Sequence, residues 1–440
     1  MHTANESVPR FIQLAYLSVA ALLLVFAFKY PPLADYVEWV YQSFIFSDLM
    51  QGRADLHFYL RDYPVPYVLV QFIMGSFNPM MGPLWSGKAT LVLYLVLAAW
   101  LSKTFIERHE LNRVLAYPLL LSCIVLNSSF WSGYINYQFG LLVLMAYLSL
   151  SEEWQDKVWV NAGFGLLAFA SHGFCLLAFG VIAGLRACTK GWRNVIQFAL
   201  ACLPAFILTL WYMKVHNNDT MQAMDAPAAY FSAKFWAYKI YTLTKSGPYQ
   251  NFMLGSVSDI DRSPVLYYAG VLTNVLLGGF LIALHVKAAQ RFKTTKTLYL
   301  SLAASVFALA YLLAPSVAVQ IVNPGERILY PELLCVFAVA LPHAAPSTRS
   351  RRWSLYAAGH IYVLLAASLV SLVVATNRQG YQHPSLDAFK EVQKNYTRIL
   401  YWHRPYQFED RFEHMAQAHG SNSAPTLPII FPTSLIGNKH

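Results

Sequence analysis

Apolar and polar positions alternate along this chain in long blocks rather than residue by residue. A bilayer core is crossed by a helix of about 20 apolar residues, and eleven apolar runs reach or approach that length: 11–29, 84–104, 113–129, 132–150, 158–171, 173–186, 195–214, 264–286, 297–316, 328–342 and 353–376. The pattern predicts an all-α polytopic membrane protein with about eleven transmembrane helices. The two shortest runs, 158–171 and 173–186, are expected to form either tilted spans or a re-entrant pair.

The short connections between the runs differ in charge. Basic residues gather in alternate connections: Lys103, Arg108 and Arg113; Arg186, Lys190 and Arg193; Lys287, Arg291, Lys293 and Lys296; Arg349, Arg351 and Arg352. By the positive-inside rule these connections are cytoplasmic. The predicted topology in the inner (plasma) membrane therefore has a cytoplasmic N-terminus and an extracytoplasmic C-terminus.

Composition supports the same conclusion. The chain is 57% hydrophobic and 12% charged, whereas a soluble domain carries about 25% charged residues. The net charge of +10 is explained by the cytoplasmic connections, so the lipid bilayer is an expected partner and nucleic acid is not.

The chain divides into a transmembrane domain, residues 1–376, and an extracytoplasmic tail, residues 377–440. Two predicted outer loops are long, 30–83 and 215–263. The first contains "VPYVLVQFIMGSF", which is apolar but only about 13 residues long and so predicts an interfacial helix. In the tail, "HPSLDAFKEVQKNYTRIL" places apolar residues at steps of three and four, which predicts an amphipathic helix.

Acidic residues mark the first outer loop. In "PPLADYVEWVYQ" (31–42), Asp35 and Glu38 are three residues apart and would share one face of a helix. The surrounding aromatic residues would desolvate a carboxylate, which raises its pKa towards the range of a useful base. Asp62 lies in the same loop. The alternative is that these acids are simply solvated.

Three other polar sites fall at predicted outer ends of spans. His172, in "ASHG", is an ionisable group between two apolar stretches, a position that favours function, although a histidine can also just bond a neighbouring carbonyl. Glu326 and Arg327, in "NPGERILY", are expected to begin a helix. The Arg327 guanidinium can offer two donors to phosphate oxygens; alternatively, the two residues pair with each other.

Asn136 lies in "NSSFWSGYINYQFG" (127–140), among several aromatic residues. Aromatic rings at this depth usually anchor a protein at the membrane interface. They can also stack on sugar rings while an amide bonds the hydroxyls. The sequence contains no P-loop, GxGxxG, HExxH or GxSxG motif, which argues against nucleotide chemistry.

Taken together, the "PPL-x-D-Y" stretch, "SGYINYQFG", "ASHG" and "GER" make the chain resemble the GT-C superfamily of membrane glycosyltransferases, over most of residues 10–376. The resemblance implies a sugar donor linked to polyprenyl phosphate and an extracytoplasmic glycan or lipid acceptor. Asp35 would be the catalytic base. Many members carry a tight acidic pair here, whereas this chain has Asp-x-x-Glu, so an obligatory metal ion is not expected. A divalent metal stays an alternative, and no other cofactor is indicated.

The residues themselves are compatible with an inverting displacement, because a lipid phosphate is a good leaving group and only a base is needed. In this hypothesis Asp35 and Glu38 are catalytic, while His172, Glu326, Arg327, Asp62 and Asn136 bind substrate. The rival predictions are a transporter or lipid flippase, a polysaccharide polymerase or O-antigen ligase using loop 215–263, and a structural membrane subunit.

Overall fold

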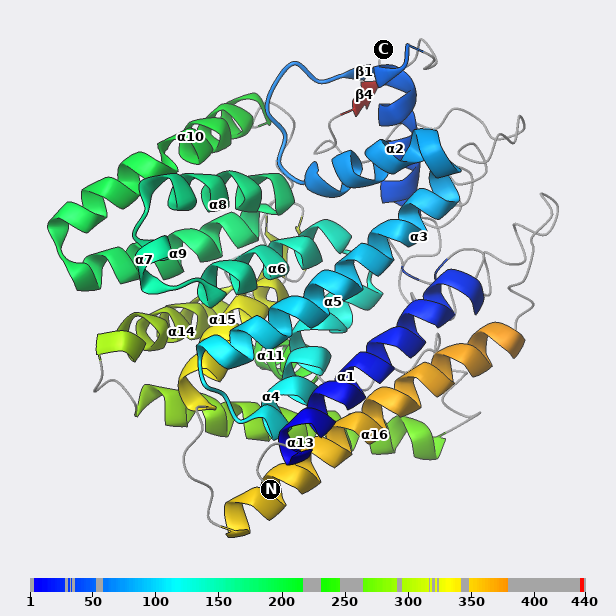
Figure 1. Ribbon diagram of the computed structural model, residues 1–440, viewed down its shortest axis with the longest axis vertical. Coiled ribbons are helices and arrows are strands. Elements are labelled where there is room, and N and C mark those ends of the chain that lie inside the picture. Colours follow the sequence, from blue (N-terminus) through cyan, green and yellow to red (C-terminus); the bar gives the residue numbers. More distant parts are fainter. Residues whose placement is uncertain are drawn as a thin grey trace.

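The computed structural model is a bundle of helices (Figure 1). It describes residues 4–27, 31, 33, 36–52, 58–216, 231–245, 264–290, 295–315, 317–318, 321–322, 324–341, 348–378 and 436–438. Within those residues each of the eleven apolar runs coincides with helix. Four very short strands accompany the helices in this described part of the chain, in two antiparallel pairs.

The first half of the chain contains α1 (Ala4–Leu22), the π-helix η1 (Leu23–Ala27), α2 (Tyr36–Met50), β1 (Phe58–Leu60), α3 (Leu69–Arg108), α4 (Arg113–Leu120), the π-helix η2 (Leu121–Val125), α5 (Ser128–Trp131), α6 (Ile135–Ser149), α7 (Glu152–Gln155), α8 (Val158–Ser171), α9 (Gly173–Lys190) and α10 (Trp192–His216). The second half contains α11 (Ala233–Lys245), α13 (Pro264–Ala289), α14 (Thr295–Leu313), β2 (Val317–Ala318), β3 (Ile321–Val322), α15 (Pro324–Ala340), α16 (Thr348–Arg378) and β4 (Ile436–Asn438).

The helices support a membrane protein. In the described part of the chain, six stretches of helix are long and apolar enough to cross a membrane: Val8–Phe26, Leu69–Arg108, Arg113–Trp131, Gly173–Lys190, Trp192–Val215 and Arg352–Val370. Four shorter apolar helices accompany them, Ile135–Ser149, Val158–Ser171, Val275–Ala289 and Thr297–Leu313. The count of eleven crossings and the sides of the loops remain predictions.

The most buried helices lie at the centre of the bundle. Residues 116–131, from α4 through η2 to α5, are all buried, as is every residue of α15 except the partly buried Ile328, and α14 packs along α15. Tyr94 from α3 helps to fix the centre, because its hydroxyl donates to the Val125 carbonyl at the end of η2 at 2.7 Å. The predicted site residues at the start of α15 are therefore part of this buried centre.

The peripheral helices expose apolar side chains instead. α10 is the clearest case, with Leu200, Phe206 and Leu210 at 61%, 55% and 49% exposure. At another edge, α1 and α16 run side by side (Figure 1), and the Tyr16 hydroxyl donates to the Leu365 carbonyl at 2.7 Å. Apolar surface on this scale needs an apolar solvent, which is what lipid supplies.

The predicted loop 30–83 is largely helical. It contains α2, and the expected interfacial helix continues into the following span as one element, α3. The chain bends inside α3 at Gly82, whose φ of 75° is the left-handed conformation that favours glycine, and Pro83 follows it. The sequence predicts an interfacial helix and a separate span, whereas the structure joins the two in one helix, α3, that is kinked at Gly82.

Other local predictions differ from the structure. Loop 215–263 contains α11. α15 begins at Pro324, four residues before the predicted span, and the expectation that Glu326 and Arg327 begin a helix is confirmed, because both lie in its first turn. The predicted tail helix lies outside the described residues. Further along the tail, β4 pairs with β1 from the first outer loop, a long-range pairing that no local pattern indicates.

We call the end of the bundle with the α8–α9 corner and the first turns of α3, α6 and α15 the outer end. The opposite end, with α7 and the last turns of α3, α9 and α15, is the inner end. These names follow the predicted topology. Chain direction alternates between the two ends from helix to helix, so segments distant in sequence meet at each of them.

Candidate functional site

Two predicted site residues, His172 and Arg327, come together at the outer end. Both are buried, at 8% and 9% exposure, although they are far apart in sequence. They are joined through three tyrosines from the starts of α3 and α6, Tyr67, Tyr134 and Tyr137. We call these five residues the His–Arg cluster.

The α8–α9 corner positions His172. Its backbone is extended between the two helices, and Nδ1 accepts from the Phe174 amide at 3.1 Å, which caps α9. The imidazole lies edge-on to Tyr67 and Tyr137, with ring centroids 4.6 and 5.1 Å away. Burial, and then the positive charge of Arg327, lower the pKa of His172 well below its ordinary value. His172 is therefore a neutral imidazole at pH 7.

The first turn of α15 positions Arg327. Its guanidinium carbon is 4.5 Å from the centre of the Tyr134 ring, a cation–π contact. The Arg327 carbonyl accepts from the Tyr137 hydroxyl at 2.8 Å. Because Tyr137 also contacts His172, one tyrosine links the histidine to the backbone of the arginine. A buried cation beside a neutral imidazole can hold an anionic group such as a phosphate.

Glu326 points to a different set of partners. Its carboxylate accepts from the hydroxyls of Ser128, Ser129 and Tyr330, at 3.5 Å from Ser129 and 3.1 Å from Tyr330. These donors come from α5 and from the next turn of α15. Within the described residues no ion pair joins Glu326 to Arg327, so the alternative of an internal pair is not what the structure shows. Glu326 instead holds α5 against α15.

Asn136 acts on the start of α3. Its Oδ1 accepts from the Val70 amide at 3.0 Å, one of the amides that the helix itself leaves without a partner. This bond fixes α3 next to α6 and so places Tyr67, two residues before α3, beside His172. Asn136 thus supports the cluster, and its role in binding substrate stays a prediction.

The acids of the first outer loop are described only in part. Asp35 lies outside the described residues, and of Glu38 the structure describes the backbone alone, in the first turn of α2. Asp62 is exposed. Among the described residues, no hydrogen bond or ion pair joins Asp62 to the His–Arg cluster.

The start of α2 is nevertheless tied to the cluster by its neighbours. The Trp39 indole donates to the Gly133 carbonyl at 3.1 Å, and the next residue, Tyr134, carries the ring under Arg327. Tyr36, the first residue of α2, is fully buried against α3 at Gly87. The first turn of α2 is therefore fixed close to the residues that hold Arg327.

Sequence reasoning missed Tyr67 and the serines. Tyr67 has a φ of 70°, rare for a residue other than glycine and typical of functional sites. The local sequence offers only two prolines just before it, Pro64 and Pro66, which restrict the backbone but do not indicate a ring beside His172. Ser128 and Ser129 gave no signal, because their role depends on a glutamate far along the chain.

A buried ionisable pair was missed as well. His285 of α13 is hydrogen bonded through Nε2 to the Glu332 carboxylate of α15, and Glu332 is 2% exposed. Both fall inside or beside predicted apolar runs, where ionisable groups favour function, so this signal could have been used. The pair can share a proton between two helices of the bundle.

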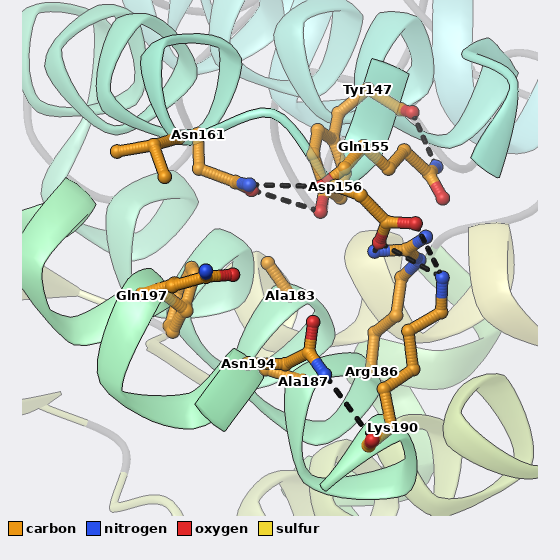
Figure 2. Close-up of a pocket in the computed structure, with 12 residues that line it drawn as sticks. Tyr147, Gln155, Asp156, Asn161, Ala183, Arg186, Ala187, Lys190, Asn194 and Gln197 are labelled. Carbon is orange, nitrogen blue, oxygen red and sulfur yellow. Dashed lines mark hydrogen bonds and ion pairs between the residues drawn. The ribbon is translucent and has the colours of Figure 1, made fainter. Parts of the chain in front are cut away.

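A pocket lies at the inner end (Figure 2). It occupies about 310 Å³ including its open mouth, and α8, α9 and α10 form most of its walls. Figure 2 shows Arg186 and Lys190 directed at Asp156 on one side of it and Gln197 on the opposite side. This inner pocket is far along the helices from the His–Arg cluster, and sequence reasoning assigned its basic residues only to topology.

Neither the site composition nor the comparisons identify a known activity. In the described part of the chain, no group of three or more His, Cys, Asp or Glu side chains could hold a metal ion. Comparison with family models, with curated proteins and with solved structures finds no match to this chain.

Proposed function

We propose that the protein is a membrane glycosyltransferase that moves a sugar from a polyprenyl-phosphate carrier to a glycan or lipid acceptor. The observation that carries this proposal is the His–Arg cluster. A buried guanidinium, a neutral imidazole and several aromatic rings gather at one end of an apolar bundle, next to the first turn of α2. In such a carrier, the phosphate matches the guanidinium and the imidazole, the sugar matches the aromatic rings, and the lipid tail matches the apolar bundle.

In this mechanism Arg327 binds the phosphate of the donor. Negative charge grows on that phosphate as the bond to the sugar breaks, and a fixed cation in a dry site stabilises such charge strongly. His172, being neutral, donates or accepts one hydrogen bond without adding charge. The rings of Tyr67 and Tyr134 offer stacking faces for the sugar.

Asp35 supplies the base. Its carboxylate removes the proton from the acceptor hydroxyl, and the resulting oxygen attacks the anomeric carbon of the sugar. The bond from that carbon to the phosphate oxygen breaks, and the electron pair leaves with the polyprenyl phosphate. A single displacement of this kind inverts the anomeric configuration. Asp35 directly precedes Tyr36, whose burial fixes the start of α2.

The experiment uses the full chain in lipid nanodiscs with polyprenyl-phosphate sugars, and it measures both labelled sugar in the product and released polyprenyl phosphate. Asp35→Asn is expected to abolish transfer and to leave the melting temperature unchanged. Asp48→Asn, the same change near the end of α2, is the control and retains transfer. Undiminished transfer by Asp35→Asn would remove the base assignment, and no turnover of any such donor by the wild-type chain would remove the proposed function.

A further inference from the structure

The inner pocket carries charge that the outer site does not explain. Arg186 is buried at 5% exposure; its guanidinium contacts the Asp156 carboxylate at 2.6 Å and donates to the Glu152 carbonyl at 3.0 Å. The Lys190 ammonium donates to the two oxygens of the same carboxylate at 2.9 and 2.7 Å. Two cations thus face one carboxylate, and one positive charge is left over beside the pocket.

Helix ends and amides add to the positive character of the pocket. α8 and α10 both begin there, at Val158 and Trp192, and the first turn of a helix attracts anions. Asn194 and Gln197 of α10 line the wall. A buried cation, two helix starts and side-chain amides around one cavity form a site for an anionic oxygen group.

The surroundings identify the membrane as the source of that group. Trp154, Trp159 and Trp192 are exposed at 43%, 63% and 70% around the same end, and tryptophan is enriched where a protein meets lipid headgroups. The Lys157 ammonium lies 3.8 Å from the Trp154 ring centre, so its positive charge lies beside one of these tryptophans. From the pocket, α10 runs away with exposed apolar side chains, a surface for acyl chains.

We propose that the inner pocket binds the phosphate headgroup of an anionic membrane lipid. The headgroup phosphate takes hydrogen bonds from Lys190 and from the amides of Asn194 and Gln197, while its acyl chains lie along α10. Basic pockets between membrane helices at the cytoplasmic surface bind lipid headgroups in this way. Binding here is independent of sugar transfer at the outer end.

Gln197→Glu tests the proposal most cleanly. Gln197 is exposed on α10, and the change keeps its shape while it adds a negative charge to the pocket and leaves the Asp156 contacts intact. Gln290→Glu is the matched control, because Gln290 is exposed at the inner end after α13 and does not line the pocket. Native mass spectrometry of the full-length protein measures the affinity for phosphatidylglycerol and for phosphatidylcholine with the same acyl chains.

The wild-type chain and Gln290→Glu are expected to prefer phosphatidylglycerol, and Gln197→Glu is expected to bind it about fivefold more weakly, the effect of one charge at an anionic membrane surface. Equal affinity for the two lipids, or equal effects of the two variants, would overturn the proposal. Displacement of the lipid by inorganic phosphate at the same concentration would show a site for free phosphate and also overturn it. If Gln197→Glu fails to fold, Lys190→Gln against Lys103→Gln makes the same comparison.

Discussion

Glu326 shows what a single buried carboxylate requires in this protein. It is 3% exposed and accepts hydrogen bonds from Ser128, Ser129 and Tyr330. Ser128→Ala removes one donor and leaves the carboxylate less well solvated, which costs about 1–3 kcal/mol. We expect a lower melting temperature in detergent, followed by intrinsic tryptophan fluorescence.

Ser132→Ala is the matched control for this prediction. Ser132 is partly exposed at the end of α5, so the loss of its hydroxyl leaves no buried acceptor behind and the melting temperature should hardly change. Equal melting temperatures for Ser128→Ala and Ser132→Ala would mean that Glu326 does not depend on α5.

At this scale the sequence identified residue types better than their roles. His172 and Arg327 could be singled out because ionisable groups beside apolar runs are costly, and the structure does bring them together. Glu326 and Asn136 were singled out too, but their partners are Ser128 and the Val70 amide, which only the packing of separate helices reveals. Tyr67 could not be found, because its left-handed backbone depends on the helices around it.

At the scale of elements, α2 and α3 are in close contact at a glycine. A Cβ added at Gly87 would lie 2.7 Å from Val40 Cγ2 and 2.9 Å from the Tyr36 ring, nearer than real Cβ atoms approach other atoms. Gly87→Ala must push α2 away from α3, and overpacking of this kind costs about 1–3 kcal/mol. Thermal unfolding in detergent measures that loss.

Gly180→Ala separates this clash from the general effect of replacing a helical glycine. A Cβ at Gly180, in the middle of α9, would meet nothing within 4 Å, so the alanine should be neutral or stabilise by up to about 1 kcal/mol. If Gly87→Ala were equally harmless, the contact that fixes the first turn of α2 against α3 would be refuted.

Asp156 joins two elements at the inner end, since it precedes α8 and contacts Arg186 and Lys190 of α9. Burial alone would raise the pKa of Asp156, but hydrogen bonds and charges from the two cations outweigh burial and hold the pKa below its ordinary value of 3.8. The stabilisation is therefore present at neutral pH and is lost as the pH falls below that value.

Asp156→Asn should therefore destabilise the protein at pH 7 by at most about 1 kcal/mol, because the carboxylate is partly exposed. The difference from the wild-type chain should shrink as the pH falls below the ordinary pKa of the acid. Melting temperatures across a pH series measure it, with the exposed Glu153→Gln as the control that shows no such trend. A difference that persists unchanged at low pH would contradict the ion-pair interpretation.

The elements themselves followed largely from hydropathy. Apolar runs became helices because a helix satisfies its own backbone in an apolar solvent, and that requirement is local. The β1–β4 pairing was missed for the opposite reason, since it depends on a partner elsewhere in the chain. The join between the interfacial helix and its span was missed because Gly82 and Pro83 bend the helix rather than end it.

At the scale of the whole molecule, orientation can be tested with a native cysteine. Cys188, near the end of α9, is exposed, whereas Cys123, Cys175 and Cys335 are buried. If the inner end is cytoplasmic, as the basic connections predict, a membrane-impermeant maleimide should label Cys188 in inverted membrane vesicles and not in intact spheroplasts. Mass spectrometry of the labelled peptide identifies the site.

The opposite end supplies the reciprocal measurement. Gln51 is exposed just after α2, so Gln51→Cys in a Cys188→Ser background should be labelled in spheroplasts and protected in inverted vesicles. Both results together require an odd number of crossings between the two positions. Labelling of Cys188 in spheroplasts would show that the topology is the opposite of the predicted one. The His–Arg cluster would then lie on the cytoplasmic side, and the carrier-linked sugar would be used in the cytoplasmic leaflet.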